Sequence, residues 1–268
     1  MDRIKKALDK SRLNKRPSPK FDLTLNDDTV YEHPFQSIVY SQSKTIEVSQ
    51  SDLAENRLIA GNNTDPRATA FGMLRTQVLY AMRENGWVSV GISGPSAEVG
   101  KSTVACNLAL SIALDINQTV LLVDADLRRP SIHKYFNFDP DYGLSDYLLG
   151  SVKLTELFVN PDINRLVLLP GRGTTAESSE LLSSPQMASL VSDLKSKYQS
   201  RIIVFDMPPL LDTADSIICL PHVDSTLLVV ENGKSTESEI KDSMRLLEST
   251  NLIGTVLNKA DEDVRNYY

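Results

Sequence analysis

The sequence predicts an α/β protein with a doubly wound, mostly parallel sheet that carries helices on both faces. Short, apolar, β-branched runs alternate along the chain with longer segments of helical periodicity, which is the order of elements found around parallel sheets. Several of these runs are continuously apolar, as expected for strands that are covered on both faces. A chain of 268 residues that is 41% hydrophobic is long enough to form one such core and a tail.

The predicted elements run from residue 67 to residue 258. Strands are expected at 87–93, 119–123, 166–169, 202–206, 225–231 and 254–258. Helices are expected at 67–84, 101–114, 181–198 and 235–249. The helix at 101–114 has small or apolar residues almost all round, which indicates tight packing on the sheet. Residues 17–63 are polar without a sustained period, and they predict a linker without regular structure.

A phosphate-binding loop is predicted between the first strand and the 101–114 helix. The loop ends in Gly100, Lys101 and Ser102, which supply a helix N-terminus, an ammonium group and a hydroxyl that suits Mg²⁺. Its first glycine, Gly94, stands one position earlier than in the usual motif. This strand, loop and helix predict a sheet of the P-loop NTPase type. The expected nucleotide contacts come from Gly94, Glu98, Val99, Gly100, Lys101, Ser102 and Thr103.

Carboxylates stand at the ends of two buried strands. Asp124 and Asp126 end the 119–123 strand, and Asp206 ends the 202–206 strand. Ligands bind beyond the carboxyl ends of parallel strands, so we expect these side chains to converge with Lys101 and Ser102. Asp206 suits a metal-bound water. Asp124 and Asp126 remain open between metal ligand, general base and water positioning, and an Asp at a strand end also commonly caps a turn.

Charge is distributed unevenly along the chain. The net charge is −7, yet residues 1–20 carry eight Lys or Arg against two Asp, so the first 20 residues stand at +6 and the remainder at −13. The acidic body and the absence of a reader motif disfavour nucleic-acid binding. Residues 1–13 predict either a short amphipathic helix that contacts lipid or a partner, or a solvated tail. With no apolar run of bilayer length and no signal sequence, the expected location is cytoplasmic.

Together these motifs resemble the bacterial tyrosine autokinases of exopolysaccharide and capsule loci, including the type found beside exosortase genes. The resemblance covers residues 65–268. It rests on the phosphate loop and on four further segments: Val123-Asp-Ala-Asp-Leu-Arg-Arg-Pro130, Gly143-Leu-Ser-Asp-Tyr-Leu148, Glu180-Leu-Leu-Ser-Ser184 and Phe205-Asp-Met-Pro-Pro-Leu210.

The resemblance implies a kinase that binds ATP with Mg²⁺ and phosphorylates tyrosines in the C-terminal tail of a neighbouring subunit. It implies a membrane activator of the polysaccharide co-polymerase type, a homo-oligomer and recruitment to the inner face of the membrane. The charge and polarity of the first residues, together with the extent of the resemblance, predict three parts: a basic tail and linker at 1–63, a kinase domain at 64–260 and a tyrosine tail at 261–268. Carried onto this sequence, the roles fall into four sets. The catalytic set is Lys101, Asp124, Asp126 and Asp206; the metal set is Ser102, Asp126 and Asp206; Arg128 and Asn258 join the nucleotide contacts; Tyr267 and Tyr268 are the phosphoacceptors.

Other functions remain open from the sequence. A nucleotide switch of the MinD and ParA type shares the fold, although Ser96 stands where the partition class usually has a signature lysine. The segment Asn258-Lys-Ala-Asp261 matches a guanine-reading motif, but ATP is favoured. A scaffold that binds nucleotide only for folding is a third reading. Two departures from the kinase pattern are expected to matter: the oligomerising helix keeps only Arg75 of its motif, with Thr69 and Gly72 at the other places, and the β-branched Val99 predicts an altered loop backbone.

Overall fold

A mostly parallel sheet forms the centre of the fold. The computed structural model describes residues 44–62, 65–115, 117–196 and 201–260. Within these ranges eight strands follow the order β1-β4-β5-β3-β6-β2-β7-β8, and only the β4 and β5 neighbours are antiparallel. The strands are β1 (Lys44–Thr45), β2 (Ser89–Ser93), β3 (Thr119–Asp124), β4 (Val159–Asn160), β5 (Leu166–Leu169), β6 (Arg201–Asp206), β7 (Ser225–Glu231) and β8 (Leu252–Asn258).

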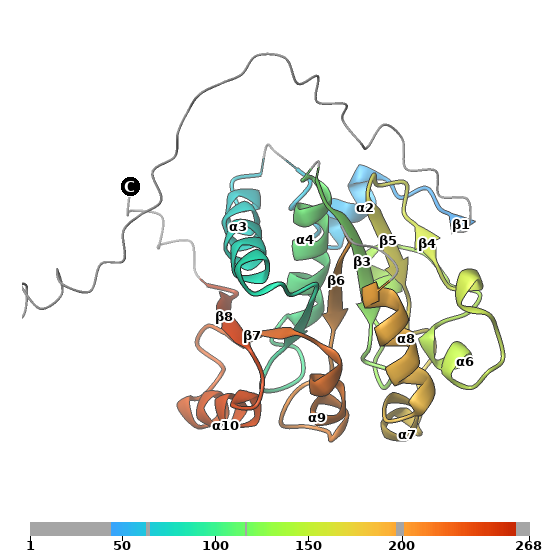
Figure 1. Cartoon of the computed structure of the whole chain (residues 1–268). Helices are drawn as coiled ribbons and strands as arrows, with labels where there is room; N and C mark the ends of the chain where they lie inside the picture. The colour runs from blue at the N-terminus through green and yellow to red at the C-terminus, as the bar shows by residue number, and fades with distance from the viewer. Residues whose placement is uncertain (1–43, 63–64, 116, 197–200, 261–268) are drawn as a thin grey trace, which may run out of the picture. The chain divides into compact units, whose positions relative to one another are not determined.

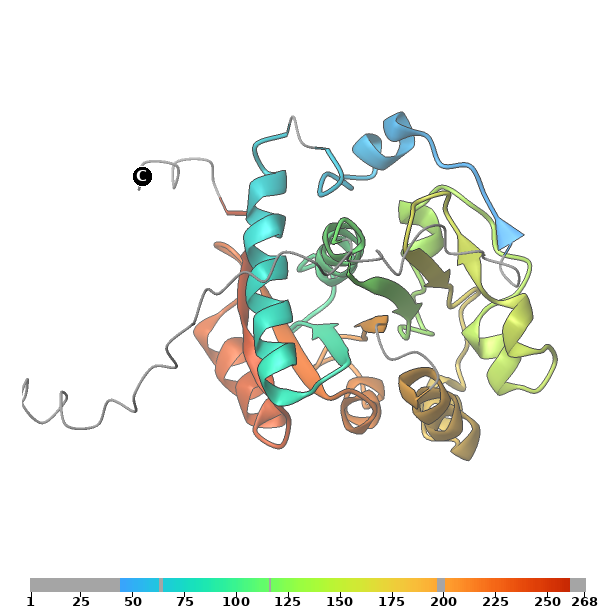
Figure 2. The same ribbon diagram turned by 45° about the horizontal axis from the view of Figure 1, so that its top comes forward.

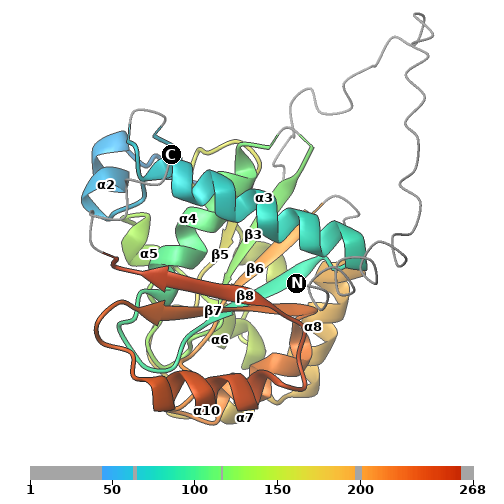
Figure 3. The same cartoon turned by 90° about the vertical axis from the view of Figure 1, so that its left-hand side faces the viewer.

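Helices cover both faces of this sheet, so the predicted fold class is confirmed (Figure 1). Figure 3 shows α3 and α4 on one side of the β7 and β8 strands and α10 on the other. The helices are α2 (Gln50–Glu55), α3 (Ala68–Asn85), α4 (Lys101–Ala113), α5 (Ile132–Tyr135), α6 (Leu144–Leu148), α7 (Ser178–Leu182), α8 (Pro185–Ser196), α9 (Asp215–Cys219) and α10 (Glu237–Leu247), with 3-10 turns η1 (Leu154–Glu156) and η2 (Leu220–His222).

The strand side chains alternate between two apolar cores. In β3, Val120 and Leu122 pack on the α3 and α4 side, whereas Leu121 and Val123 pack on the opposite side. The same alternation continues along β6 and β7. Because side chains in a strand point alternately to the two faces, burial on both faces requires the continuous apolar runs seen in the sequence.

Residues 44–62 correct the expectation of an irregular linker. This N-terminal segment adds β1 to the edge of the sheet beside β4, and it then forms α2, which begins with a capping box at Ser49. Leu53, Leu58 and Ala60 are buried in the α4 core. The polar composition concealed this, because three apolar side chains are enough to anchor the segment on the core, and the ribbon of the segment lies on the α4 side of the sheet (Figure 2).

The predicted 181–198 helix was also wrong in detail, since it is two helices. α7 ends at Leu182 and α8 begins at Pro185. Proline favours the first turn of a helix and lacks the N–H that a continuous helix would need there, so Pro185 sets the break. The other main elements agree with the prediction to within two residues or so at each end.

Within the described ranges, none of the helices combines the length and the apolar character that crossing a bilayer requires. Cys106 and Cys219 are both buried and form no disulfide. The proposed helix at 1–13, Asp261 and the tyrosine pair lie outside the described residues.

Candidate active site

The phosphate loop, residues 94–100, joins β2 to α4 with very little free space around it. A Cβ on Gly94 would lie 2.5 Å from the Val229 carbonyl oxygen, and one on Gly100 would lie 1.9 Å from Asn258 Nδ2. Gly100 also has φ +96°, a conformation that side chains with a Cβ rarely adopt. Position 94 therefore requires glycine, because β7 passes directly beside it.

Five hydrogen bonds from outside the loop fix its backbone. Two come from main-chain N–H groups after β6, one ends on a carboxylate, and two come from side chains at the end of β8 and directly after it. The pairs are Leu210 N to Gly94 O (2.8 Å), Leu211 N to Pro95 O (3.0 Å), Ala97 N to Asp212 Oδ2 (3.0 Å), Lys259 Nζ to Glu98 O (2.9 Å) and Asn258 Nδ2 to Val99 O (2.9 Å). The loop is thus held before any phosphate arrives.

The strained residue of the loop is Glu98 and not Val99. Glu98 has φ +64°, whereas Val99 is not among the residues with positive φ and its side chain is 1% exposed. The expected distortion at Val99 was therefore wrong. Val99 keeps an ordinary backbone and fills a space in the core, while the neighbouring carboxylate residue takes the left-handed conformation.

This placement predicts opposite effects for two glycine substitutions. Glu98→Gly should raise the free energy of unfolding by up to about 1 kcal/mol, since glycine adopts positive φ without steric cost. Val99→Gly should lower it by about 2 kcal/mol or more, since it empties a buried position. Urea unfolding of both variants measures the difference. Destabilisation by Glu98→Gly together with a neutral Val99→Gly would contradict the placement.

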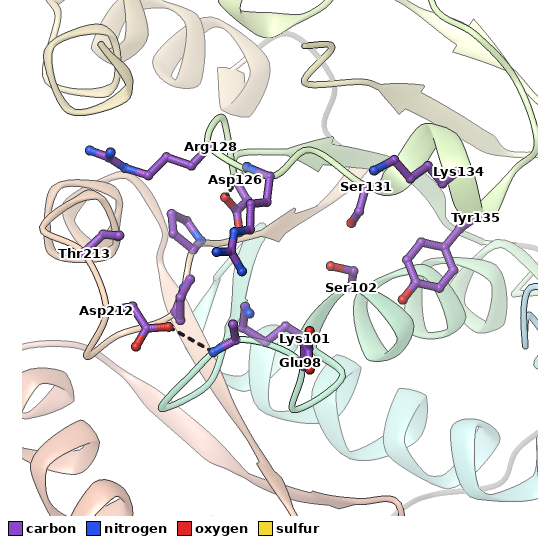
Figure 4. Close-up of a pocket in the computed structure, with 14 residues that line it drawn as sticks. Glu98, Lys101, Ser102, Asp126, Arg128, Ser131, Lys134, Tyr135, Asp212 and Thr213 are labelled. Atoms are coloured by element: carbon purple, nitrogen blue, oxygen red, sulfur yellow. Dashed lines mark hydrogen bonds between the residues drawn. The ribbon is translucent and has the colours of Figure 1, made fainter. Parts of the chain in front are cut away.

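A cavity of about 550 Å³, the candidate catalytic cavity, lies beyond the carboxyl ends of the central strands (Figure 4). Lys101 and Ser102 reach it from the start of α4, and Asp126 from the turn after β3. Further cations surround it although the whole chain is acidic: Arg128, Arg129 and Lys134. A basic hollow at a helix N-terminus matches the charge of a polyphosphate.

Two buried carboxylates lie side by side beneath this cavity. Asp124 and Asp206 are paired in register on β3 and β6, and both are 0% exposed. Burial raises the pKa of the Asp206 carboxyl to about 7, against the opposing influence of the Ser102 hydroxyl and the Lys101 ammonium. Burial and the Asp206 charge raise the pKa of Asp124 well above its usual range. Such a pair needs a cation or protons to balance it.

The three aspartates differ in what their oxygens contact. Asp124 Oδ2 accepts the backbone N–H groups of Ser131 and Ile132 at 2.8 and 3.0 Å, and so fixes the turn into α5. Asp126 Oδ1 accepts the Arg129 N–H at 3.0 Å, and this residue lines the cavity. Both oxygens of Asp206 are buried without a hydrogen-bond partner in the described part of the chain.

These contacts fit a hydrated Mg²⁺ ion better than a metal held by protein alone. No cluster of three or more His, Cys, Asp or Glu side chains in the described ranges is placed to hold a metal directly. Mg²⁺ usually keeps several waters and binds one or two protein groups together with phosphate oxygens. The unpartnered Asp206 oxygens and the nearby Ser102 hydroxyl suit that arrangement.

Two predicted nucleotide contacts have protein partners. Arg128 lines the cavity, but its guanidinium pairs with Asp215 at 2.8 Å, and Asp215 is fully buried and also accepts the Ser178 and Ser179 hydroxyls. Asn258 donates to the loop at Val99. Both side chains therefore organise the site, and direct contact with nucleotide remains a prediction for each.

Sequence reasoning missed two residues that line the cavity and one that holds a lining side chain in place. Asp212 holds the Ala97 N–H, and Tyr135 donates to or accepts from the Thr103 hydroxyl at 2.8 Å. Asp215 lies 87 positions further along the chain than Arg128, and its carboxylate accepts a hydrogen bond from the Arg128 guanidinium and so fixes that side chain. In the sequence, Asp212 stands close to the Pro208-Pro209 motif, which was the one hint that it lies near the site. No motif close to Tyr135 or Asp215 in the sequence pointed to either residue.

The two remaining motifs of the sequence begin at Gly143 and Glu180, and they lie near residues that hold the site in place. Gly143 begins α6, and a Cβ there would lie 2.4 Å from the Gly171 carbonyl oxygen. Ser145 donates to the carbonyl oxygens of Gly171 and Arg172 at 3.1 Å each. A Cβ on Gly171 would lie 3.3 Å from Cγ of Asp124, so the Gly143 motif contacts the loop beside that carboxylate. The Glu180 segment continues α7, whose first two residues, Ser178 and Ser179, donate their hydroxyls to Asp215.

A braced phosphate loop, a lysine and a serine at the start of α4, and carboxylates at the neighbouring strand ends define a nucleotide-binding protein of the P-loop class. Residues 92–259 match the family described as "AAA domain", and the chain belongs to that family.

Its relatives are bacterial tyrosine-protein kinases, which confirms the resemblance seen in the sequence. The chain is 34% identical over 205 residues to the putative tyrosine-protein kinase EpsB of Ralstonia solanacearum, a match that covers 76% of this chain and 27% of that protein. The chain thus spans about a quarter of the length of such curated relatives. The kinase domain of the Escherichia coli tyrosine kinase ETK superposes with a TM-score of 0.71 at 29% identity, over 84% of this chain and 91% of that domain.

A MinD protein shares the fold. The septum site-determining protein MinD of Pyrococcus horikoshii OT3, complexed with Mg-ADP, superposes with a TM-score of 0.53 at 24% identity, over 63% of this chain and 68% of that one. At this level of identity the likeness shows a common architecture.

Proposed function

We propose that this chain is an ATP-dependent protein-tyrosine autokinase of exopolysaccharide biosynthesis and export. The observation that carries the proposal is the placement of the buried Asp206, whose oxygens have no hydrogen-bond partner in the described ranges, near Lys101 and Ser102 at a preformed phosphate loop. The kinase relatives, whose solved domain is covered almost completely by this chain, support the same activity. The acceptors are Tyr267 and Tyr268 of the terminal tail.

The residues divide the work as follows. Lys101 and the loop N–H groups bind the terminal phosphates of ATP and balance the charge that gathers there during transfer. Ser102 and Asp206 would hold Mg²⁺, Asp206 by way of a water, and the ion would supply positive charge to the phosphate oxygens. Asp124 acts by fixing the turn at Ser131.

Asp126 is the carboxylate that an incoming tyrosine meets, since it lines the cavity and Asp124 does not. The tyrosine hydroxyl oxygen forms a bond to the terminal phosphorus as the bond to the bridging oxygen breaks and ADP leaves. Asp126 takes the hydroxyl proton. The products are phosphotyrosine and ADP.

The resemblance supplies the setting for this activity. We place the chain in the cytoplasm at the inner face of the membrane, with a polysaccharide co-polymerase as activator and further copies of itself as partners. Arg75, which survives from the oligomerising motif, donates to the Ser111 carbonyl oxygen at 2.8 Å and braces α3 on α4.

Replacing both tail tyrosines by phenylalanine tests the acceptor. Wild-type protein incubated with Mg²⁺ and γ-labelled ATP should incorporate label, and the Tyr267→Phe, Tyr268→Phe variant should incorporate less than about a tenth as much, because phenylalanine has no hydroxyl to accept the phosphoryl group. ATP binding measured by calorimetry should be unchanged, which serves as the control. Full labelling of the variant would place the acceptor elsewhere. ATP hydrolysis without label in wild-type protein would favour the nucleotide switch.

A further inference from the structure

A second cavity lies on the other side of the start of α4. This side cavity has a volume of about 820 Å³, within the range of small-molecule sites. Its walls come from α3, from the first turns of α4, from the end of β8 and from the N-terminal segment 44–62. Phe71, Leu74 and Val256 give it an apolar side. Thr103 borders it and also bonds to Tyr135 of the catalytic cavity, so the two cavities meet at this turn of α4.

The side cavity is placed to take the nucleoside end of ATP, a step that rests on the proposed function. The terminal phosphates belong beside Lys101 and Asp126 in the catalytic cavity. The nucleoside is attached to the α-phosphate, at the opposite end of the triphosphate from the terminal phosphate. The apolar wall beside Thr103 suits its purine ring. The α-phosphate then lies near the junction of the two cavities.

One of the cationic side chains that line the side cavity belongs to the segment before the matched P-loop domain. Arg57 lies just after α2, in the segment that precedes the family match, and it lines the side cavity together with Thr103 and Asn107. Its side chain is exposed and carries no ion pair in the described part of the chain. Burial raises the pKa of Tyr135, and the Thr103 hydroxyl and the Arg57 charge oppose that rise, so the Arg57 charge acts on the junction of the cavities.

The backbone of Arg57 is strained and is held in place by α4. Arg57 has φ +61° in the left-handed position after a helix, where glycine or asparagine is usual. Its carbonyl oxygen accepts from Asn107 Nδ2 at 2.9 Å. Asn107 is fully buried, and its Oδ1 accepts the N–H groups of Ile59 and Ala60 at 2.8 and 3.0 Å. An amide of the phosphate-loop helix therefore fixes the main chain from which the Arg57 side chain extends.

We infer that Arg57 is a nucleotide-binding residue, which the N-terminal segment 44–62 supplies to the α-phosphate of the nucleotide in the side cavity. Glycine would adopt the left-handed conformation at position 57 without the free-energy cost that arginine carries there, and contact between the Arg57 guanidinium and a phosphate would offset that cost. A guanidinium near an unpaired phosphate provides charge-assisted hydrogen bonds. Asn107 couples this contact to α4, the helix that carries Lys101 and Ser102.

The substitution Arg57→Gly separates binding from folding, because the two effects have opposite signs. It removes the charge, so the Kd for Mg·ADP measured by calorimetry at physiological salt should rise about 10- to 100-fold. It also removes the backbone strain, so the Tm of the nucleotide-free protein should stay the same or rise. Arg57→Lys keeps the charge and should bind Mg·ADP within about threefold of wild type.

Arg172→Gly is the matched control. Arg172 is also a left-handed arginine, at φ +49°, but it lines neither cavity, and its replacement should leave the Kd for Mg·ADP unchanged. An unchanged Kd in Arg57→Gly would overturn the inference, as would an equal loss of affinity in Arg172→Gly or a loss in Arg57→Lys as large as in Arg57→Gly. Failure of the kinase proposal looks different: wild-type protein would bind Mg·ADP through Arg57 and form no phosphotyrosine. If wild-type protein bound no nucleotide, both ideas would fall.

Discussion

Replacing Lys101 by methionine should abolish phosphotyrosine formation, with a fall in rate of at least about a thousandfold. Lys101 is the first residue of α4, its side chain is only 7% exposed, and no other cation arises from the loop itself. Methionine keeps most of the length and volume of the side chain and loses the ammonium group, so the loop should keep its shape. The rate is measured from phosphotyrosine formed over time with Mg·ATP.

Lys241→Met is the control for this prediction. Lys241 pairs with Glu237 on the exposed face of α10, away from both cavities, so its loss should leave the rate near that of wild type. A Lys101→Met variant with more than about a tenth of the wild-type rate would contradict the assigned role, since transfer of a phosphoryl group without this charge is expected to be far slower.

Asp206→Asn should lower the rate of phosphotyrosine formation by about a hundredfold or more and should stabilise the nucleotide-free protein at the same time. The side chain is fully buried beside Asp124, and both of its oxygens lack hydrogen-bond partners in the described ranges. Removing one of two adjacent buried carboxylates relieves their repulsion, which should raise the free energy of unfolding by about 1 kcal/mol or more. Losing the carboxylate also removes a metal-binding group.

Two measurements on the Asp206→Asn variant check this prediction. Urea unfolding without nucleotide measures the gain in stability, and calorimetry measures how far Mg²⁺ tightens ATP binding. We expect a higher unfolding midpoint and a smaller effect of Mg²⁺. A variant that is less stable and still responds fully to Mg²⁺ would show that Asp206 serves the fold and does not serve the metal.

The sequence was enough to predict those parts of the site that are built from residues close together in the chain. The phosphate loop is one continuous segment, so its strand, glycines and lysine could be found together. Asp124 and Asp206 follow buried strands of similar composition, and their convergence follows from the rule that parallel strands end at one edge.

The contacts it missed join segments far apart in the chain. Asn107 looks like one more small residue of a packed helix, yet its amide bonds to the main chain at Arg57, 50 positions away. The same holds for Asp215, whose partner Arg128 was expected to contact nucleotide. The loop strain fell on Glu98 because backbone dihedrals depend on how the loop is held by Leu210, Asp212 and Lys259, which no local pattern records.

The most direct test of the central claim is the mass of the C-terminal proteolytic peptide after the whole protein has been incubated with Mg·ATP. If the site formed by Lys101, Asp126 and Asp206 transfers the terminal phosphoryl group of ATP, the peptide should carry phosphate on Tyr267 or Tyr268 in wild-type protein and none in Lys101→Met. An unmodified peptide from wild-type protein that calorimetry shows to bind ATP would contradict the claim.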